Sequence, residues 1–597
     1  MMHYRTFLAA MLVSSQTLWA QEGDKAPSLA GENAYFVAHR FRMPQARSHF
    51  EREDLTWMYR PNALSTLNER VSGLMAPERS VMGYGTGVTT SNLFSIRGIG
   101  GADRTRLFVD GVPTYTGVYG QNAANAMMAM MADGAEVVRG PEGSFVGNGG
   151  MAGSINLLSR QRTESGEETT AEINTGSYGT MQVTAHSSVK VANFFASAGA
   201  LLGRTDGHRS DTRFMQEGGF AKVGVNVGKH WQLQGLALLS YCEDSNPGSL
   251  RQIWENKDIK GRTGLAHVSL YNSYDRSHGA ARVYFNFGRD GASRGSRLGA
   301  TLQQTFPLGP STTLSLAADY SGWDNSIRYS SIPQDSLRRK EHELGFRAQA
   351  RHQLLNCLSL YGAIRFDSHS RMGSEWSPCV GAELALPFKL RLTGNISKGH
   401  RNPTLAEQFV YNAENRSLQA ERLTNYEVAV RQSLLGGRMR WAVTAFYLRA
   451  NRLVEMTRVN DRWQAWNTGQ AEHGGLEAEV NVMPFDWLGV HANYSVMGTS
   501  RARLLAPKHK FFMEGDVLFW RFQLSAGLQY LGGLHTMAGN TEATEHATLV
   551  NLAFTYHTLS VFHVFLRADN LLGQRYSLAN GISMPKATVM IGAGVNL

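Results

Sequence analysis

Apolar and polar residues alternate along most of this chain, in segments of about ten residues that Gly, Asn, Asp and Ser separate. The alternation begins after about residue 162 and continues to the last residue. Every second residue is apolar in residues 488–496 and again in residues 589–597. Period two over segments of this length, repeated without helices between them, is the signature of a transmembrane β-barrel. The apolar face would contact lipid, and polar residues such as Glu477 and Glu479 would face a wet lumen.

The length of this region limits the number of strands. Residues 162–597 comprise 436 residues, and a tilted membrane strand uses about 9–11 residues. Twenty-two strands leave about 20 residues for each strand with its connection. Eight strands would require connections of about 45 residues, which are uncommon without structure of their own. We therefore predict an all-β transmembrane fold, a large antiparallel barrel of about 22 strands with a small α+β domain in its lumen, although length alone does not separate about 18 strands from about 22.

Residues 45–161 have a different texture and are predicted to form that small domain. Asn62 can cap a short helix that Gly73 ends, and Asp110-Gly111 between apolar runs signals a β-hairpin because both residues tolerate positive φ. Arg139 would end a strand, since the proline two residues later cannot donate to a central ladder. A wide lumen would be an open pore unless something filled it, so this domain is predicted to plug the barrel. A methionine run within it is interpreted as packing, with copper binding as the less favoured alternative: Met127, Met128, Met130 and Met131.

The N-terminus predicts export. Residues 1–20 are similar to a secretory signal peptide, with Arg5 before a short apolar core. That core is shorter than the about 20 apolar residues that span a bilayer. Residues 21–44 would then be a polar periplasmic segment. An isolated apolar pentad in this segment could add a strand to a partner's sheet, or could be a chance cluster in a tail: Ala34, Tyr35, Phe36, Val37 and Ala38.

Composition narrows the chemistry of the chain. The net charge of +10 favours phosphorylated lipid headgroups or an anionic ligand over nucleic acid as a partner of an exported protein. No Gly-x-Ser-x-Gly elbow appears in a strand–turn–helix context, so we expect no enzyme and no catalytic residues. No resident metal or cofactor is predicted. The three cysteines allow at most one disulfide: Cys242, Cys357 and Cys379.

Short motifs in a shared order carry a family resemblance. The small domain contains SIRG at 95–98, LFVDGVP at 107–113 and EVVRGPEG at 136–143. The barrel region contains NPTLAEQF from residue 402, NYEVAVR at 425–431, NTGQAEHGGLEAEV at 467–480, PKHK at 507–510 and LRADNLLGQRY at 566–576. With these motifs, essentially all of the mature chain resembles a TonB-dependent outer-membrane receptor.

The resemblance implies an active transporter in the outer membrane. A TonB-type energy-coupling protein would pull on the N-terminal segment, for which residues 34–38 are the candidate contact. A plug arginine pair would meet a barrel glutamate pair, which by motif are Arg97 and Arg139 with Glu427 and Glu477. Arginine pairs with carboxylates bidentately, so such a network could hold a plug and still rearrange. The alternative is that these four residues form ordinary ion pairs or are solvated lumen charges.

The cargo is less specified by the sequence. The resemblance implies an iron chelate, such as a ferric siderophore, first, and haem or cobalamin next. Haem is less favoured because no histidine lies between residues 50 and 185, and haem iron is commonly held by histidine. Residues that could fix a ligand by amphipathic contact and hydrogen bonds lie in the loops of the plug: Tyr84, Tyr115, Tyr119, Gln121 and Asn122.

Two basic clusters are expected in extracellular loops, where they would attract an anionic chelate or bind the phosphates of outer-membrane lipid. A passive plugged porin is the alternative of another class. Whether a surface lipoprotein caps the receptor is not encoded in any motif. The basic clusters are Arg289, Arg294 and Arg297, and Arg338, Arg339 and Lys340.

Overall fold

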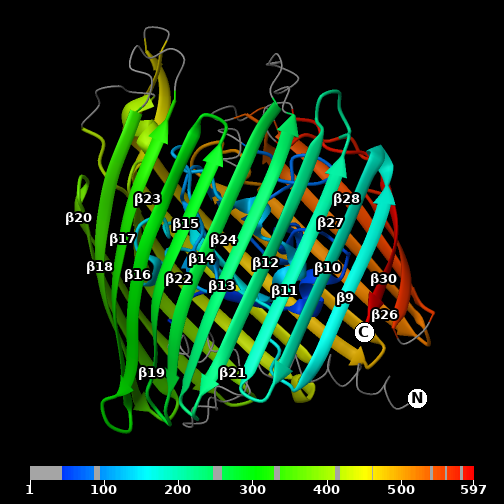
Figure 1. The fold of residues 1–597 in the computed structure, drawn as a ribbon. Coiled ribbons are helices and arrows are strands. Elements are labelled where there is room, and N and C mark those ends of the chain that lie inside the picture. Colours follow the sequence, from blue (N-terminus) through cyan, green and yellow to red (C-terminus); the bar gives the residue numbers. More distant parts are fainter. Residues whose placement is uncertain are drawn as a thin grey trace.

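A closed antiparallel barrel of 22 strands encloses a small N-terminal domain in the computed structural model (Figure 1). The structure describes residues 43–86, 94–245, 258–328, 337–410, 417–459, 462–537, 542, 544–558, 561–578 and 582–597. Within these ranges no helix is both long and apolar enough to cross a bilayer. The barrel and its internal domain confirm the predicted fold class, with the strand number at the upper end of the range that length allowed.

Each barrel strand pairs with its neighbours in the sequence, and β30 closes the barrel on β9. Connections at one end are as short as residues 192–193, and those at the other end are as long as residues 402–420, which is the extracellular end by the usual pattern of such barrels. The strands are β9 Gly166–Gly176, β10 Thr180–Val191, β11 Phe194–Thr205, β12 Phe214–Val227, β13 Trp231–Ser245, β14 Asp258–Ser273, β15 His278–Asp290, β16 Ser293–Pro307, β17 Thr312–Ile327, β18 Leu337–Leu355, β19 Leu358–His369, β20 Gly373–Leu386, β21 Leu390–Arg401, β22 Glu421–Leu434, β23 Met439–Val459, β24 Arg462–Phe485, β25 Leu488–Thr499, β26 His509–Phe519, β27 Phe522–His535, β28 Thr544–His557, β29 Phe562–Asp569 and β30 Thr588–Asn596.

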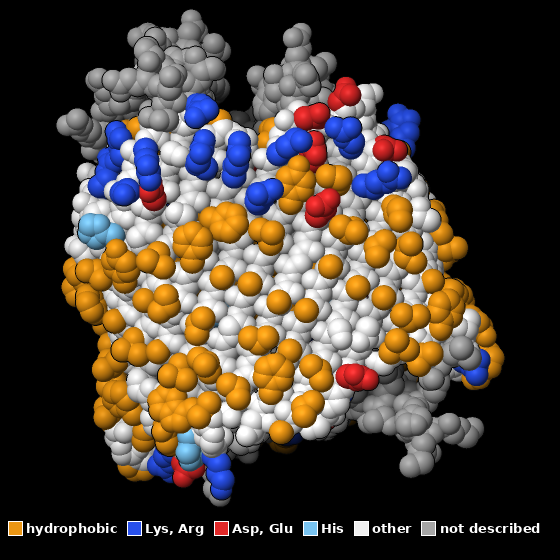
Figure 2. Space-filling view, viewed as in Figure 1, with side chains coloured by type: hydrophobic (Ala, Val, Ile, Leu, Met, Phe, Trp, Pro, Cys, Tyr) orange, Lys and Arg blue, Asp and Glu red, His pale blue; other side chains and the backbone are white. Residues whose placement is uncertain are grey.

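The alternation places one set of side chains on the outer surface and the other in the lumen. Along β14, Val268 is exposed, while its neighbours His267 and Ser269 are buried against the interior. Figure 2 shows apolar side chains across the middle of the outer face, with a band of charged side chains toward the extracellular end. An apolar belt below a charged rim is the surface that a bilayer and its headgroups require.

The internal domain, called the plug below, contains two small sheets and short helices. Its larger sheet has the order β1-β7-β8-β5-β6, with β5 parallel to β8, and its smaller sheet has the order β2-β3-β4. The strands are β1 Arg47–Glu51, β2 Leu74–Met75, β3 Ser95–Ile96, β4 Ile99–Gly100, β5 Thr105–Val109, β6 Val112–Pro113, β7 Ala132–Arg139 and β8 Gly153–Ser159. The helices are α3 Arg52–Thr56, α4 Ala63–Arg70 and α5 Gly143–Val146, with 3-10 turns η3 Ala124–Ala126 and η4 Ala129–Met131. Outside the plug, η6 (Ala406–Val410), η5 (Ser177–Gly179) and η7 (Leu435–Gly437) lie in barrel connections.

Local signals in the plug sequence account for several of these elements. The Asn62 side chain accepts a hydrogen bond from the Leu64 N–H at 3.0 Å and caps α4, as predicted. Asp110 (φ 49°) and Gly111 (φ 74°) form the tight turn between β5 and β6, also as predicted. The helix ends at Arg70, earlier than the Gly73 that the sequence suggested. The next residue, Val71, is already extended, and α4 therefore stops before the glycine.

The apolar core of the plug extends to the barrel wall and forms one cluster with side chains of the barrel. The methionine run lies in this core, where Met127, Met128 and Met131 are fully buried and Met130 is 9% exposed. These side chains pack against barrel residues such as Leu201 and Phe220. The methionines therefore fill space between plug and barrel, which is the packing role that the sequence favoured.

Candidate functional site

The centre of the plug–barrel interface is a buried arginine. Arg97 lies in the turn between β3 and β4 with φ 51°, and its side chain has no exposed surface. Its Nε and Nη2 donate to Glu477 of β24 at 3.0 and 2.8 Å, and its Nη1 donates to Glu427 of β22 at 2.7 Å. The guanidinium also lies 4.2 Å from the ring centre of Phe446. One plug side chain thus binds two barrel strands in a charge-assisted, partly bidentate arrangement.

A second plug arginine extends this network. Arg139, the last residue of β7, lies 3.2 Å from Glu477 and 2.5 Å from Glu479 through its Nη1. It also donates to the hydroxyl of Ser72. The structure therefore brings together all four residues that the family motif proposed and adds Glu479. Glu479 lies two residues after Glu477 on the same face of β24, so the alternation that indicated one lumen carboxylate also indicated the other.

Burial and charge act in opposite directions on the two plug arginines. Burial alone would lower the pKa of Arg97, but Glu477 and Glu427 raise it above its usual value. Burial would likewise lower the pKa of Arg139, but the charges of Glu477 and Glu479 outweigh burial and raise that pKa. Both guanidinium groups stay charged at any physiological pH. Release of the network therefore requires movement of the plug rather than loss of a proton from arginine.

Further polar ties connect the plug to the wall at other heights. Arg104 of the plug donates to Glu421 at 2.9 and 2.6 Å, and Arg401 at the extracellular end of β21 shares the same carboxylate at 2.7 Å. Lys510 of β26 donates to the carbonyls of Val71 and Leu74 at 2.8 and 2.6 Å, just beyond α4. The plug and barrel partners of these ties lie hundreds of residues apart in the sequence, and no local pattern pairs them.

The hairpin turn of the plug is itself one of these ties. Asp110 accepts hydrogen bonds from the Ser159 N–H at 2.8 Å and hydroxyl at 2.5 Å, and it lies 3.2 Å from Lys222 of β12. Burial alone would raise the pKa of Asp110, but Lys222, His267 and the Ser159 hydrogen bonds together hold it below its usual range. The turn signal in the sequence thus marked a plug–barrel contact as well as a hairpin.

The residues proposed to meet cargo are all buried in this structure. Tyr84, predicted as a candidate ligand contact, has no exposed surface in this structure, and its hydroxyl donates to the Ala76 carbonyl at 3.1 Å. A domain as small as the plug needs its large side chains in the core, and this tyrosine stacks near Phe94 with ring centres 6.1 Å apart.

The other four residues lie where the plug meets the extracellular ends of barrel strands. The hydroxyl of Tyr115 donates to Asn325 at 3.3 Å, and Gln121 donates to Asp290 at 3.1 Å. Tyr119 packs with a cluster that includes Leu405 and Ile327. Asn122 donates to the Thr105 carbonyl at 3.0 Å, within the plug. They are 5–9% exposed, so contact with cargo would require these loops to open.

The basic clusters are not loop residues, which corrects the sequence interpretation. The connection between β15 and β16 consists of residues 291–292 alone. Gly291 adopts φ 56°, which allows this tight turn. Arg289 and Arg294 are directly paired across these strands and exposed on the outside, whereas Arg297 lines the lumen. In the second cluster, Arg338 and Lys340 are exposed and Arg339 lies over the Phe409 ring. The exposed members lie at the extracellular ends of β15, β16 and β18.

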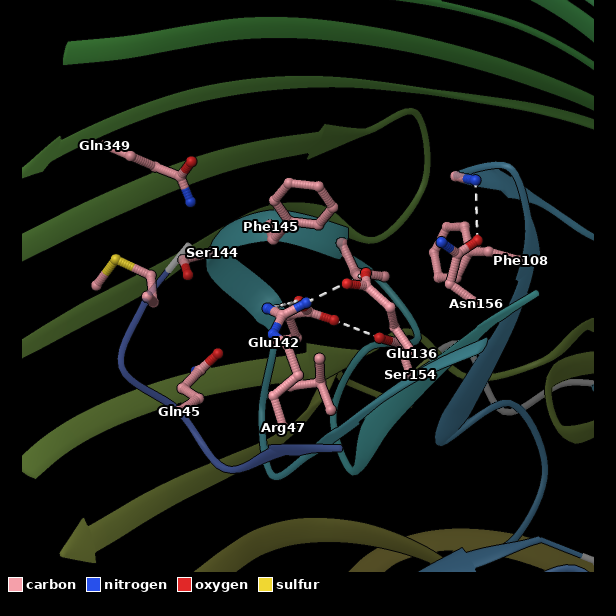
Figure 3. Close-up of a pocket in the computed structure, with 14 residues that line it drawn as sticks. Gln45, Arg47, Phe108, Glu136, Glu142, Ser144, Phe145, Ser154, Asn156 and Gln349 are labelled. Carbon is pink, nitrogen blue, oxygen red and sulfur yellow. Dashed lines mark hydrogen bonds and ion pairs between the residues drawn. The ribbon is translucent and has the colours of Figure 1, made fainter. Parts of the chain in front are cut away.

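Two cavities lie between the plug and the wall. The smaller, of about 30 Å³, is shown in Figure 3 with Arg47 directed toward Glu142 and Glu136, at 3.2 and 3.5 Å. The larger, of about 80 Å³, lies against β15–β19. In the described part of the chain, no group of three or more His, Cys, Asp or Glu side chains is arranged to hold a metal ion. The three cysteines do not pair with one another. The predicted energy-coupling residues 34–38 and the signal peptide lie outside the described residues.

Comparison with known proteins places this architecture among characterised ones. A family model described as TonB dependent receptor-like, beta-barrel matches residues 163–571, and the TonB-dependent Receptor Plug Domain matches residues 40–154. The chain is 20% identical to a protein named vitamin B12 transporter BtuB of Photobacterium profundum, over 74% of this chain and 76% of that protein. It is 21% identical to proteins of that name from Vibrio cholerae, over 39% of each chain.

Solved structures show the same fold at low identity. A variant of the ferric enterobactin receptor PfeA of Pseudomonas aeruginosa superposes with a TM-score of 0.76 and 16% identity, covering 93% of this chain and 98% of that chain. The siderophore receptor PirA of Acinetobacter baumannii gives a TM-score of 0.75 and 13% identity, covering 92% and 98% of the two chains.

Proposed function

Because the chain belongs to the TonB-dependent receptor family of outer-membrane receptors and transporters rather than enzymes, we propose that it imports a scarce metal chelate by active transport. The cargo would bind at the cell surface and reach the periplasm with energy delivered by a TonB-type protein. The network around Arg97 is the observation that carries this proposal. Since it joins the plug to two barrel strands in full burial, a large solute passes only after work has been done on the plug.

The size of the cavities argues against a passive plugged porin. The larger of the two cavities described between plug and wall is about 80 Å³, whereas sites for drug-sized ligands have roughly 300–1,000 Å³. Neither of these two cavities, among the described residues, is wide enough for a chelate to pass beside the plug. A passive channel would need a standing opening of its solute's size, and an active importer needs only a plug that moves on demand.

An iron chelate is the first cargo that we propose. Arginines line the larger cavity and the extracellular end of the interface, and such groups favour carboxylate, catecholate or similar anionic ligands. Cobalamin is the second candidate, because the relative from Photobacterium profundum that matches over 74% of this chain carries the name of a vitamin B12 transporter.

Uptake of labelled cargo separates these possibilities. Cells that express the protein in a background without other receptors are supplied with ⁵⁵Fe chelates or with ⁵⁷Co-cobalamin, with and without a functional TonB. We expect TonB-dependent accumulation of a ferric chelate. Accumulation of cobalamin alone would establish the second candidate, and accumulation that is equal without TonB would refute active transport.

A proline substitution tests whether residues 34–38 are the energy-coupling segment. If residues 34–38 add a strand to the coupling protein, Phe36→Pro removes a backbone donor from that strand and should abolish uptake while surface binding of cargo persists. Glu32→Pro, outside the pentad, is the matched control and should transport normally. Normal uptake by Phe36→Pro would show that the coupling contact lies elsewhere.

A further inference from the structure

The larger cavity is bounded by the plug on one side and by five neighbouring barrel strands on the other. From the plug, the β5–β6 hairpin and α5 contribute Phe108, Gly111 and Phe145, and the wall is formed by β15–β19. One water needs about 10–15 Å³ of such space, so about 80 Å³ holds several waters or one small polyatomic group. The cavity is too small for a whole chelate and large enough for one of its polar substituents.

The lining of this cavity is strongly basic. Two of its arginines have carboxylate partners: Arg106 pairs with Asp103 at 3.2 Å, and Arg365 pairs with Asp319 and Asp367 at 2.6 and 2.8 Å. Their charge is largely compensated. The arginines that line the cavity are Arg106, Arg282, Arg297, Arg347 and Arg365.

Arg297 differs from the two paired arginines. It comes from β16 and is held between two aromatic rings, 4.8 Å from the ring centre of Trp323 and 5.6 Å from that of Tyr284. Its Nη2 donates to the hydroxyl of Ser321 at 2.8 Å. Its Nε and Nη1 are buried and have no hydrogen-bond partner among the described residues. The guanidinium is therefore fixed in place with two buried donors directed at no protein acceptor. Because Nε–H and Nη1–H point to different sides of the guanidinium, a carboxylate oxygen can accept from one of them while Nη2 stays on Ser321.

An acceptor without a partner faces the same cavity. The Oε2 of Glu343 is buried and has no hydrogen-bond partner among the described residues. Glu343 lies on β18 and Arg297 on β16, on either side of β17, and Glu343 is two residues along from the position in register with Arg297. Their backbones are therefore separated by about 12 Å. A molecule that carries a carboxylate and a hydroxyl group can satisfy both side chains at once, because the hydroxyl can donate to Glu343.

We propose that this cavity is an internal binding site for a hydroxycarboxylate, which places its carboxylate on Arg297 and its hydroxyl on Glu343. The hydroxycarboxylate is either a free acid or a substituent of the transported chelate. Its place in transport rests on the proposed function, whereas binding itself does not. Both cavities share Phe108, Gly111, Phe145 and Val146, so the site adjoins the smaller cavity shown in Figure 3. Phe145 forms part of the partition between them and lies over the Arg347 guanidinium at 4.3 Å.

Calorimetry on the purified, detergent-solubilised full-length protein tests the site. Citrate and tricarballylate are the probes, because they differ only in the hydroxyl group. We expect citrate to bind and tricarballylate to bind at least about fivefold more weakly. Arg297→Gln should weaken citrate at least tenfold, and Glu343→Gln should reduce the preference for citrate. Arg294→Gln, on the outer face of the same strand, is the control and should bind as the wild type does.

Two further measurements keep the test decisive if Arg297→Gln does not fold. Arg297→Lys keeps the charge and should bind citrate with intermediate affinity. Citrate should change the tryptophan fluorescence, and Trp323→Phe should remove that change. Absence of citrate binding in the wild type, equal affinity for the two acids, or wild-type affinity in a folded Arg297→Gln protein would each overturn the proposal.

Transport assays then distinguish the source of the ligand. If the group belongs to the cargo, Arg297→Gln slows uptake of ferric citrate while its affinity at the cell surface is unchanged. If citrate binding is lost and uptake is unchanged, the site takes a free hydroxycarboxylate. A wild-type protein that transports no chelate would refute the proposed function and leave the calorimetric result to decide the binding site.

Discussion

Replacing Arg97 by glutamine is the most direct test of how the plug is held. The substitution removes one buried positive charge and three charge-assisted hydrogen bonds, to Glu477 and Glu427. Glu477 keeps Arg139 at 3.2 Å, and Glu427 keeps the N–H of Ala46 at 2.7 Å. Glu477 and Glu427 therefore remain buried in the interface, and Arg139 is the one close arginine that is left to the pair.

The magnitude follows from this imbalance. Removing one partner of a buried ion pair costs about 3–5 kcal/mol, because the remaining charge stays desolvated. A factor of ten in an equilibrium constant is about 1.4 kcal/mol, so the open form of the plug should become about 10² to 4 × 10³ times more populated. Glu427→Gln in the same protein removes one of the stranded charges and should recover part of the loss.

Hydrogen exchange measured by mass spectrometry on the purified protein reports this population. Peptides that cover residues 94–110 should lose protection in Arg97→Gln, and barrel peptides should not. Arg338→Gln is the control, since that arginine is 65% exposed and pairs with Asp324 on the surface, where ion pairs contribute about 0–1 kcal/mol. Equal protection of the plug peptides in Arg97→Gln and Arg338→Gln would refute the idea that the network holds the plug.

Three further predictions concern other parts of the plug. Asp110→Asn should leave the buried charge of Lys222 without its carboxylate partner and raise permeability to large antibiotics at neutral pH. Because the pKa of Asp110 is depressed, its contribution to stability is present above about pH 4 and is lost as the pH falls below that value. The permeabilities of wild type and variant should therefore converge in acid. Burial raises the pKa of Glu78 from 4.5 to about 7, so stability falls as the pH rises from about 4.5 to about 7, and the loss is complete above that range. Glu78→Gln should therefore raise the melting temperature of the protein at pH 8 and change it little at pH 4, and equal shifts at both pH values would contradict this. Ser48 and Val137 are register partners in β1 and β7, and a disulfide between Ser48→Cys and Val137→Cys should block uptake without affecting surface binding of cargo. Reduction of the disulfide should restore uptake. Transport by the oxidised protein would show that these strands need not separate.

The barrel was more predictable from sequence than the site. Period-two alternation is a property of each strand alone, and it correctly placed Glu477 in the lumen. Its partner Arg97 is 380 residues away and was found only through a family motif. The contact between Asp110 and Lys222 has no local signal, because the turn motif specifies a backbone shape and not what its side chain meets.

The burial of Tyr84 has no signal in the local sequence. The sequence around it contains glycines and was interpreted as a loop facing ligand, but a tyrosine in a loop is free to turn inward. The plug has few residues with which to form a core, and Tyr84 fills part of that core with Phe94 beside it. The basic cluster at residues 289–297 was misassigned for a related reason. Its glycines suggested a loop, whereas the two strands extend to within two residues of each other.

The path from the N-terminal segment to the arginine network is short. The first described strand of the plug, β1, pairs only with β7 within the described part of the plug sheet, and β7 ends at Arg139. Just before β1, the N–H of Ala46 donates to Glu427 and its carbonyl accepts from the N–H of Arg139 at 3.0 Å. Force applied to the segment before residue 43 would thus reach a carboxylate and an arginine of the network through one residue.

A polar interface suits this kind of release. An apolar contact loses its stabilisation in proportion to the area separated, whereas buried charges become tolerable as soon as water reaches them. Displacing Ala46 would expose Glu427 first, and water at Glu427 would weaken its attraction to Arg97 by raising the local dielectric constant. Within the arginine network, release would then begin with the admission of water at one point, and the remaining ion pairs would loosen after it. On this reasoning the plug is stable until it is pulled, and the ion pairs can form again when the pull ends.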